Sequence, residues 1–257
     1  MSWIQKFVNI TAVSISVTVL LISSLPRIVI AESPLALKFP KFQSWQISQK
    51  FIPPNRSAPQ TTAGGATRGA SCYLQGKETL TALMPLNKSG LTLAERPTFY
   101  WFVPQIPVET ARFSLLDGED IVYETTFKLP KQLGIIGFTL PSKAPSLKIN
   151  KNYHWYMSIA CGSEEVGDEI TVDGWVERIQ PTTDLSKQLA RTNPKQLSQV
   201  YAASGIWYEV LHTLVQQRLT EPSDRTVMAN WQALLESVGL NNLVSKPLVN
   251  SWDAKTK

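Results

Sequence analysis

Apolar and polar residues alternate in short runs through the middle of the chain, and prolines, glycines and polar pairs separate these runs. Alternation with a period of two is typical of β-strands that bury one face. The pattern predicts strands within 79–85, 98–103, 111–116, 120–129, 134–140, 152–161 and 169–179. Asp117-Gly118 is expected to close the third and fourth strands into a tight hairpin, because glycine tolerates positive φ. Residues 72–181 are therefore predicted to form an antiparallel, immunoglobulin-like β-sandwich of about seven strands.

The period changes after Pro181, where apolar residues recur every three or four positions, as on one face of a helix. Four short helices are predicted, with starts at Thr183 or Asp184, at Pro194 behind an Asn193 N-cap, at Ile206, and behind a Ser223 N-cap. Gly205 and Gly239 are expected to end the second and the fourth. Residues 182–240 are therefore predicted to form a helical bundle packed on the sandwich, followed by a polar tail over residues 241–257.

The last two predicted helices each have a single apolar face, and they are expected to form an antiparallel hairpin around Pro222. In the third helix this face comprises positions 206, 207, 210, 211, 214, 215 and 219. In the fourth it comprises Val227, Met228, Trp231, Leu234, Leu235 and Val238. Spacings of three and four place each set on one side of its helix, which predicts that both sets face the core.

The stretch Glu95–Pro104, ERPTFYWFVP, places four aromatic residues in one predicted strand. Alternation assigns Tyr100 and Phe102 to one face, and Phe99 and Trp101 to the other. Because both faces are apolar, the strand is predicted to be central, covered by the opposing sheet on one side and by the helices or the preceding segment on the other. The polar tip of Tyr100 is the part of this strand that could still reach a ligand.

The first residues have the features of an export signal. Lys6 precedes an apolar run over residues 7–25, and small or apolar residues lie just before and at Ala31. Residues 1–31 are therefore predicted to be a signal peptide cleaved between Ala31 and Glu32, so that the protein is exported to the periplasm, the outer envelope or the exterior. An uncleaved membrane anchor is the alternative, because the run is nearly long enough to span a bilayer.

Residues 32–71 mix prolines, glycines and small polar residues without a helical or strand period, which predicts a disordered tether. Removal of Lys6 and Arg27 with the signal leaves 23 basic and 20 acidic residues. So small a positive balance, spread along the chain, argues against a nucleic-acid partner. Contact with a membrane is expected only through an uncleaved signal.

The sequence contains two cysteines, Cys72 and Cys161. Since an even number of cysteines in an exported protein favours a disulfide, a bond between them is predicted. Two separated, buried thiols are the alternative. Two cysteines and two distant histidines provide too few ligands for a metal site of the zinc type, and no metal or cofactor is predicted.

No assembled catalytic motif is recognisable, so no catalytic residue is predicted. His154 lies on the more polar face of its predicted strand, and His212 lies outside the apolar face of its helix, where it is expected to be solvated. The acidic loop at residues 162–169 contains Glu164, Glu165, Asp168 and Glu169, which could bind calcium or serve a hydrolase. Because the ligand spacing of a calcium loop is missing, a solvated hairpin loop is the favoured interpretation.

Several segments together resemble a known family, the exported cyanobacterial proteins that contain domain of unknown function 928. The resembling segments are GATRG before Cys72, LTALMP, GLTLAERPTFYWFVP, ARFSLLD, VYETTFKLP, YHWYMSIAC, VDGWVERI and ASGIWYEVLHTL, which extend over about residues 66–240. The resemblance implies a bacterial, exported protein and does not imply any reaction. Both cysteines fall within resembling segments, which agrees with the predicted disulfide.

Together these predictions favour a non-enzymatic, exported binding or scaffold protein of the bacterial cell envelope. Its partner would be another envelope or exported protein, or a polysaccharide. The alternative is a carbohydrate-binding module that uses exposed aromatic residues, for which Tyr100, Trp155 and Trp175 are the candidate ligand contacts. A hydrolase is the third hypothesis.

Overall fold

The computed structural model describes residues 50–54, 78–106, 108–132, 134–160 and 169–249. All of these residues belong to one compact unit, Gln46–Lys257. Four predictions fall wholly or mostly on residues outside this described part of the chain. They are the signal peptide 1–31 with its cleavage between Ala31 and Glu32, the disordered tether 32–71, of which residues 50–54 alone are described, the disulfide between Cys72 and Cys161, and calcium binding by the acidic loop, of which Glu169 alone is described.

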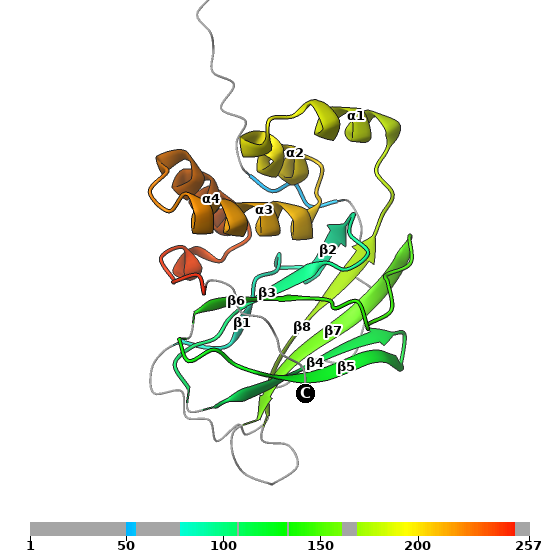
Figure 1. The fold of residues 1–257 in the computed structure, drawn as a ribbon, viewed down its shortest axis with the longest axis vertical. Helices are drawn as coiled ribbons and strands as arrows, with labels where there is room; N and C mark the ends of the chain where they lie inside the picture. The colour runs from blue at the N-terminus through cyan, green and yellow to red at the C-terminus, as the bar shows by residue number, and fades with distance from the viewer. Residues whose placement is uncertain (1–49, 55–77, 107, 133, 161–168, 250–257) are drawn as a thin grey trace, which may run out of the picture. The chain divides into compact units, whose positions relative to one another are not determined.

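Two β-sheets form the larger part of the unit, and the helices lie together beside them (Figure 1). The three-stranded sheet has the order β1-β3-β6, from β1 (Thr81–Ala82), β3 (Thr98–Phe102) and β6 (Ile135–Thr139). The five-stranded sheet has the order β2-β8-β7-β4-β5, from β2 (Ser89–Thr92), β8 (Glu169–Arg178), β7 (Lys151–Ala160), β4 (Thr110–Asp117) and β5 (Asp120–Lys128). The prediction of a strand-rich part, here with two sheets, followed by helices is confirmed.

The described residues contain eight strands, and one of them departs from the predicted antiparallel arrangement. β2 pairs in parallel with β8, in a register that sets Ser89 opposite Trp175. The sequence pattern misses β2 because its four residues, SGLT, include a glycine and show no clear alternation. Gly90 is needed there, since a Cβ at this position would lie 2.8 Å from Cε2 of Tyr208 on α3 (Trp207–Thr220). The five-stranded sheet is therefore mixed, and its β2 edge lies against α3.

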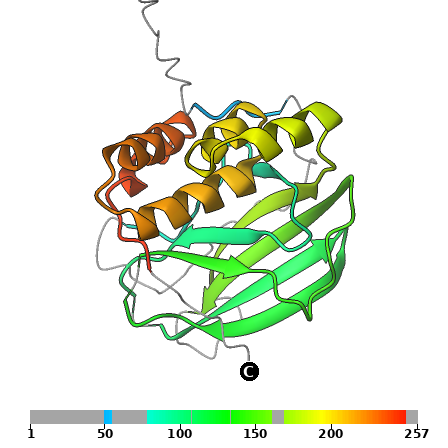
Figure 2. The same ribbon diagram turned by 45° about the horizontal axis from the view of Figure 1, so that its top comes forward.

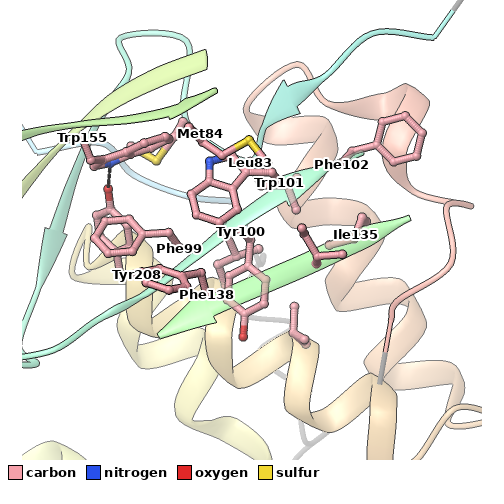
Figure 3. Close-up of a cluster of buried hydrophobic side chains, with 14 of the residues drawn as sticks. Leu83, Met84, Phe99, Tyr100, Trp101, Phe102, Ile135, Phe138, Trp155 and Tyr208 are labelled. Carbon is pink, nitrogen blue, oxygen red and sulfur yellow. Dashed lines mark hydrogen bonds between the residues drawn. The ribbon is translucent and has the colours of Figure 1, made fainter. Parts of the chain in front are cut away.

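β3 carries the aromatic stretch and separates the core between the sheets from the helices (Figure 3). Phe99 and Trp101 point between the sheets, where their ring centroids lie 5.6 Å and 5.8 Å from that of Trp155. Tyr100 lies on the opposite face, toward α3. Phe99 and Trp101 are completely buried, and Phe102 is 4% exposed. The prediction that this strand is central and covered on both faces is confirmed.

The helical part follows the predicted starts and ends closely. Its elements are α1 (Thr183–Arg191), the 3-10 turn η1 (Pro194–Gln196), α2 (Leu197–Ala203), α3, α4 (Arg225–Ser237) and the 3-10 turn η2 (Asn241–Leu243) (Figure 2). Asn193 caps η1 as predicted, and Gly205 and Gly239 have the positive φ that commonly ends a helix. None of the helices in the described residues has the length and hydropathy needed to cross a bilayer.

Two predicted details of α4 are wrong. Asp224 rather than Ser223 is the N-cap, because its Oδ1 accepts the backbone N–H groups of Thr226 and Val227. Met228 is 51% exposed, although the apolar stripe predicts its burial. It lies at the edge of the stripe, and α4 packs through the other members, all of which are buried.

α3 is fixed to the strands by aromatic side chains that also form hydrogen bonds. The hydroxyl of Tyr208 accepts from Nε1 of Trp155 at 2.8 Å (Figure 3). The same hydroxyl donates to the carbonyl of Trp175 at 3.0 Å. Nε1 of Trp207 donates to the carbonyl of Leu83, just after β1, at 2.9 Å. These bonds tie the first turn of α3 to the five-stranded sheet and to the β1 segment. The polar groups next to them on α3 are therefore held in fixed positions.

The predicted tether and the predicted polar tail both contain residues that pack on the fold, which the sequence pattern does not indicate. Within the predicted tether, Phe51 is buried against Trp207, with ring centroids 4.9 Å apart. At the other end, residues assigned to the polar tail form η2, and Leu248 bridges to Ile135 of β6. An apolar residue in an otherwise polar segment makes each of these contacts.

Candidate functional site

A pocket of about 370 Å³ opens where α2 and α3 meet β3 and β6. Its wall includes Glu209 and His212 from α3, Tyr201 from α2, Thr98 from β3 and Thr139 from β6. These residues come from segments far apart in the sequence, so only the folded chain brings them together. Its volume lies at the lower end of the range that ligand sites in proteins occupy.

Glu209 stands in the first turn of α3 and binds the segment that follows β2. Its Oε1 accepts three hydrogen bonds: from Oγ1 of Thr92 at 2.7 Å, from the backbone N–H of Leu93 at 2.8 Å, and from the N–H of Ala94 at 3.1 Å. Since segments that leave a strand need partners for their backbone N–H groups, this carboxylate satisfies donors that would otherwise be lost. Glu209 therefore links the helix to the loop that forms one side of the pocket.

The second carboxylate oxygen of Glu209 has a different environment. Oε2 is buried and has no hydrogen-bond partner among the described residues. Burial raises the pKa of Glu209, although the hydrogen bonds from Thr92, Leu93 and Ala94 act in the opposite direction. A buried polar atom without a partner costs about 1–3 kcal/mol. The site thus holds one oxygen that a proton or a ligand donor would stabilise.

His212 lies one turn beyond Glu209 and also lines the pocket. Its Nδ1 is 2.7 Å from the hydroxyl of Tyr100. Burial raises the pKa of Tyr100 and lowers the pKa of His212, so at neutral pH the phenol keeps its proton and the imidazole is neutral. Tyr100 then donates to Nδ1, which puts the imidazole proton on Nε2. That Nε2–H has no protein acceptor within the described residues. His212 is exposed over part of its surface, as predicted, but the rest is covered and Tyr100 holds its ring, so the imidazole is not freely solvated.

Hydroxyl groups line the rest of the pocket. Oγ1 of Thr98 and Oγ1 of Thr139 lie 2.8 Å apart across β3 and β6. Tyr201 is partly buried, and its pKa is raised first by burial and second by the negative charge of Glu209. Arg96 donates to the carbonyls of Pro141 and Ala144, at 3.3 Å and 3.2 Å, which holds the loop after β6 beside the pocket. The pocket therefore combines hydroxyls, one imidazole N–H, one carboxylate and the guanidinium of Arg96 with aromatic walls.

The other histidine belongs to a separate cluster on the outer face of the five-stranded sheet. His154 is 3% exposed, and its Nε2 lies 3.0 Å from Oδ2 of Asp173. Its Nδ1 lies 2.9 Å from the hydroxyl of Tyr156, and its ring stacks on Trp175 with centroids 4.2 Å apart. Nζ of Lys88 donates a hydrogen bond to Oδ1 of Asp173 at 2.6 Å. The predicted polar strand face is correct for His154, yet Trp175 and Tyr156 bury it.

Asp173 is strongly held in this cluster. Burial acts to raise its pKa, but the hydrogen bonds from His154 and Lys88 outweigh burial and leave the pKa lowered. Every ring nitrogen of His154 and every carboxylate oxygen of Asp173 thus has a protein partner, as in a structural network.

The three aromatic residues proposed as ligand contacts do not form a shared surface. Tyr100 is 6% exposed, Trp155 is 1% exposed and Trp175 is 8% exposed. Trp155 lies between the sheets, whereas Trp175 covers His154 on the outer face. None of the three offers an open ring face to a ligand, and Tyr100 acts on the pocket only through His212.

The sequence pattern did not single out Glu209, the acidic residue that lines the pocket. Glu209 interrupts the run IWYEVL, and its neighbours Tyr208 and Val210 are both buried. An acidic residue with apolar residues on both sides, at the start of a buried helix, is the signal that could have indicated it. Arg96 and Tyr201 carry no comparable signal, because their roles depend on which segments meet.

Metal ligands do not gather in the described part of the chain, where no three His, Cys, Asp or Glu side chains form a group able to hold an ion. Glu169, the described end of the acidic loop, pairs with Nη2 of Arg112 through both carboxylate oxygens, at 2.8 Å and 2.7 Å. This carboxylate is thus engaged in an ion pair across β8 and β4.

The sequence model of the family described as Domain of Unknown Function (DUF928) matches residues 63–248. The chain belongs to this family. No curated protein matches the chain. The DUF928 match extends over all eight described strands and the four α-helices, so both histidine clusters and the pocket belong to the DUF928 domain itself.

Proposed function

We propose that this DUF928 protein is a non-enzymatic binding protein whose pocket beside α3 holds a small, hydroxyl-rich ligand such as the end of a saccharide chain. The observation that supports this most directly is the buried, unpartnered Oε2 of Glu209 in the wall of a pocket. A hydroxyl that donates to this oxygen would remove the cost of leaving it unpaired.

The other pocket groups fit the same ligand chemistry. A sugar hydroxyl both donates and accepts hydrogen bonds. The hydroxyls of a sugar could therefore accept from the Nε2–H of His212 and donate to the hydroxyl oxygens of Thr98 and Thr139. Tyr201 and Tyr208 supply aromatic surface, which suits the apolar face of a sugar ring. This mode of binding replaces the exposed aromatic row as the basis for carbohydrate recognition.

The number of carboxylates in the pocket favours a binding protein over a hydrolase. Glycosidases of the usual kind place two carboxyl groups on either side of the scissile bond. Among the described residues that line the pocket, Glu209 is the one acid. If the protein is exported, as its first residues predict, a polysaccharide of the cell envelope is the ligand source that fits both the setting and the pocket.

The test is a titration of the purified full-length protein with mono- and oligosaccharides, in which NMR or calorimetry measures binding. Three variants sharpen it: Glu209→Gln, His212→Asn, which keeps an acceptor near Nδ1 but loses Nε2–H, and His154→Asn as the matched control. The proposal expects at least one saturable saccharide whose affinity falls about tenfold in the first two variants and is unchanged in the third. Equal affinities in all three variants, or no saccharide bound, would refute it, and cleavage products would show a hydrolase instead.

A further inference from the structure

A second hollow, of about 300 Å³, lies at the hairpin formed by α3 and α4. It is lined by Arg218 from α3, by Arg225, Met228 and Trp231 from α4, and by Val244 after η2. The hollow thus combines two guanidinium groups with an apolar surface. Met228, whose exposure contradicts the apolar stripe, is part of that surface.

Arg218 is the unusual member of this set. Its guanidinium carbon lies 4.8 Å from the ring centroid of Trp231. Its Nη1 is buried and has no hydrogen-bond partner among the described residues. Burial also lowers the pKa of Arg218, because it removes water from a positive charge. A cation–π contact offsets part of this loss, but it leaves the in-plane N–H donors without acceptors.

Within the described part of the chain, no carboxylate around this hairpin forms an ion pair with Arg218. Glu221 lies 2.7 Å from Nζ of Lys195, and Asp224 uses Oδ1 to cap α4. Glu236 accepts from Nε2 of Gln232 at 2.7 Å. Nε1 of Trp231 is likewise engaged, with the carbonyl of Val244 at 3.1 Å. These neighbours therefore leave the guanidinium donors of Arg218 available, while Gln232, which also lines the hollow, bonds Glu236 through Nε2.

We propose that this hollow is a binding site for a small monocarboxylate with an apolar body. The planar edge of a guanidinium matches the two oxygens of a carboxylate, and such charge-assisted pairs are among the stronger hydrogen bonds in proteins. Arg218 would bind the carboxylate from the floor and Arg225 from the rim. Met228, Trp231 and Val244 would contact the apolar body. The site rests on residues other than those of the Glu209 pocket, so neither proposal depends on the other.

Hexanoate is a suitable probe, with 1-hexanol as its neutral counterpart and hexyl phosphate as the other anion. Each is titrated into the full-length wild-type protein, Arg218→Met and Arg191→Met, and binding is followed by NMR shifts of the Trp231 indole. Arg191, exposed at the end of α1, is the matched control. Arg218→Met removes a partly buried charge and keeps apolar contact with Trp231, so we expect it to fold, and the unfolding midpoint without ligand verifies this.

The proposal expects saturable hexanoate binding by the wild type and by Arg191→Met, at least about tenfold weaker binding by Arg218→Met, and weaker binding of 1-hexanol to all three. Hexanoate should also raise the unfolding midpoint of the wild type but not that of Arg218→Met. Equal hexanoate affinity in the two variants, or no binding at all, would overturn the site. Binding of 1-hexanol or hexyl phosphate at least as tight as that of hexanoate would overturn the carboxylate assignment.

Discussion

The two histidines of this chain differ in what surrounds them, and the difference separates a structural cluster from a candidate site. His154 on β7 uses both ring nitrogens within the protein, on Asp173 and Tyr156. His212 on α3 uses Nδ1 on Tyr100, and its neighbour Glu209 keeps one oxygen without a partner. A cluster in which every polar atom has a protein partner contributes to stability, whereas unengaged groups in a pocket remain available to a ligand. The comparison predicts opposite responses to substitution.

The largest effect is expected at the His154 cluster, from Asp173→Ala. Removing this carboxylate leaves Nε2 of a buried His154 without its partner, which should lower the free energy of unfolding by about 2–3 kcal/mol at neutral pH. Lys88 is mostly exposed, so its lost ion pair should add little. Urea unfolding measures the change, with exposed Asp120→Ala as the control. A loss no greater than that of the control would show that the network is not structural.

The same variant has a defined pH dependence. The pKa of Asp173 is lowered in the folded state. The stability that ionised Asp173 contributes is therefore complete above its pKa in the unfolded chain, about 3.9, and is lost as the pH falls through its pKa in the folded state. The difference between the wild type and Asp173→Ala should therefore shrink in acid. A difference that stays constant down to the acid transition would argue against the lowered pKa.

Substituting each histidine by asparagine compares the two clusters directly. Asparagine keeps an acceptor near Nδ1 and removes Nε2, so His154→Asn loses the bond to Asp173 and the stacking on Trp175. We expect a loss of about 1–2 kcal/mol there and less than about 0.5 kcal/mol for the exposed His212→Asn, which keeps an acceptor for Tyr100. Equal losses in thermal or urea unfolding would remove the distinction between the clusters.

Glu209→Gln should be more stable than the wild type, by a margin that grows as the pH rises. Burial raises the folded-state pKa of Glu209, so the folded state holds this proton more firmly than the unfolded chain does. The stability that protonated Glu209 contributes is complete below its pKa in the unfolded chain, about 4.3. It decreases as the pH rises through its pKa in the folded state. Glutamine has no proton to lose, so the variant should match the wild type in acid and exceed it by on the order of 1 kcal/mol at higher pH. Urea unfolding across that range is the measurement, and a variant that is less stable at high pH would contradict the raised pKa.

The sheets and helices could be predicted because their signals are local. Alternation in residues 98–103 and 152–161 and the caps at Asn193 and Gly239 lie within a few neighbouring positions. β2 could not be predicted, since it pairs in parallel with β8 and depends on the space at Gly90 for side chains of α3. Its existence is decided by contacts between distant segments.

The pocket was less predictable for the same physical reason. Glu209 caps backbone groups of Leu93 and Ala94, more than a hundred positions earlier in the chain. His212 was correctly placed outside the apolar stripe, but its bond to Tyr100 depends on how α3 lies on β3. An unpartnered oxygen is a property of the whole surroundings, which no local pattern encodes.

The smallest expected effect concerns Tyr100→Phe, which tests how His212 is oriented. A phenol that donates to Nδ1 stabilises the neutral imidazole, so its removal should raise the pKa of His212 slightly, against the lowering caused by burial. It should also reduce the fraction of imidazole that carries its proton on Nε2. Ring ¹⁵N and ¹H shifts of His212, followed through a pH titration, report both quantities, with His154 as the internal control. If the shifts of His212 do not respond, Tyr100 does not set the tautomer, and the Nε2–H would no longer be a fixed donor for a ligand.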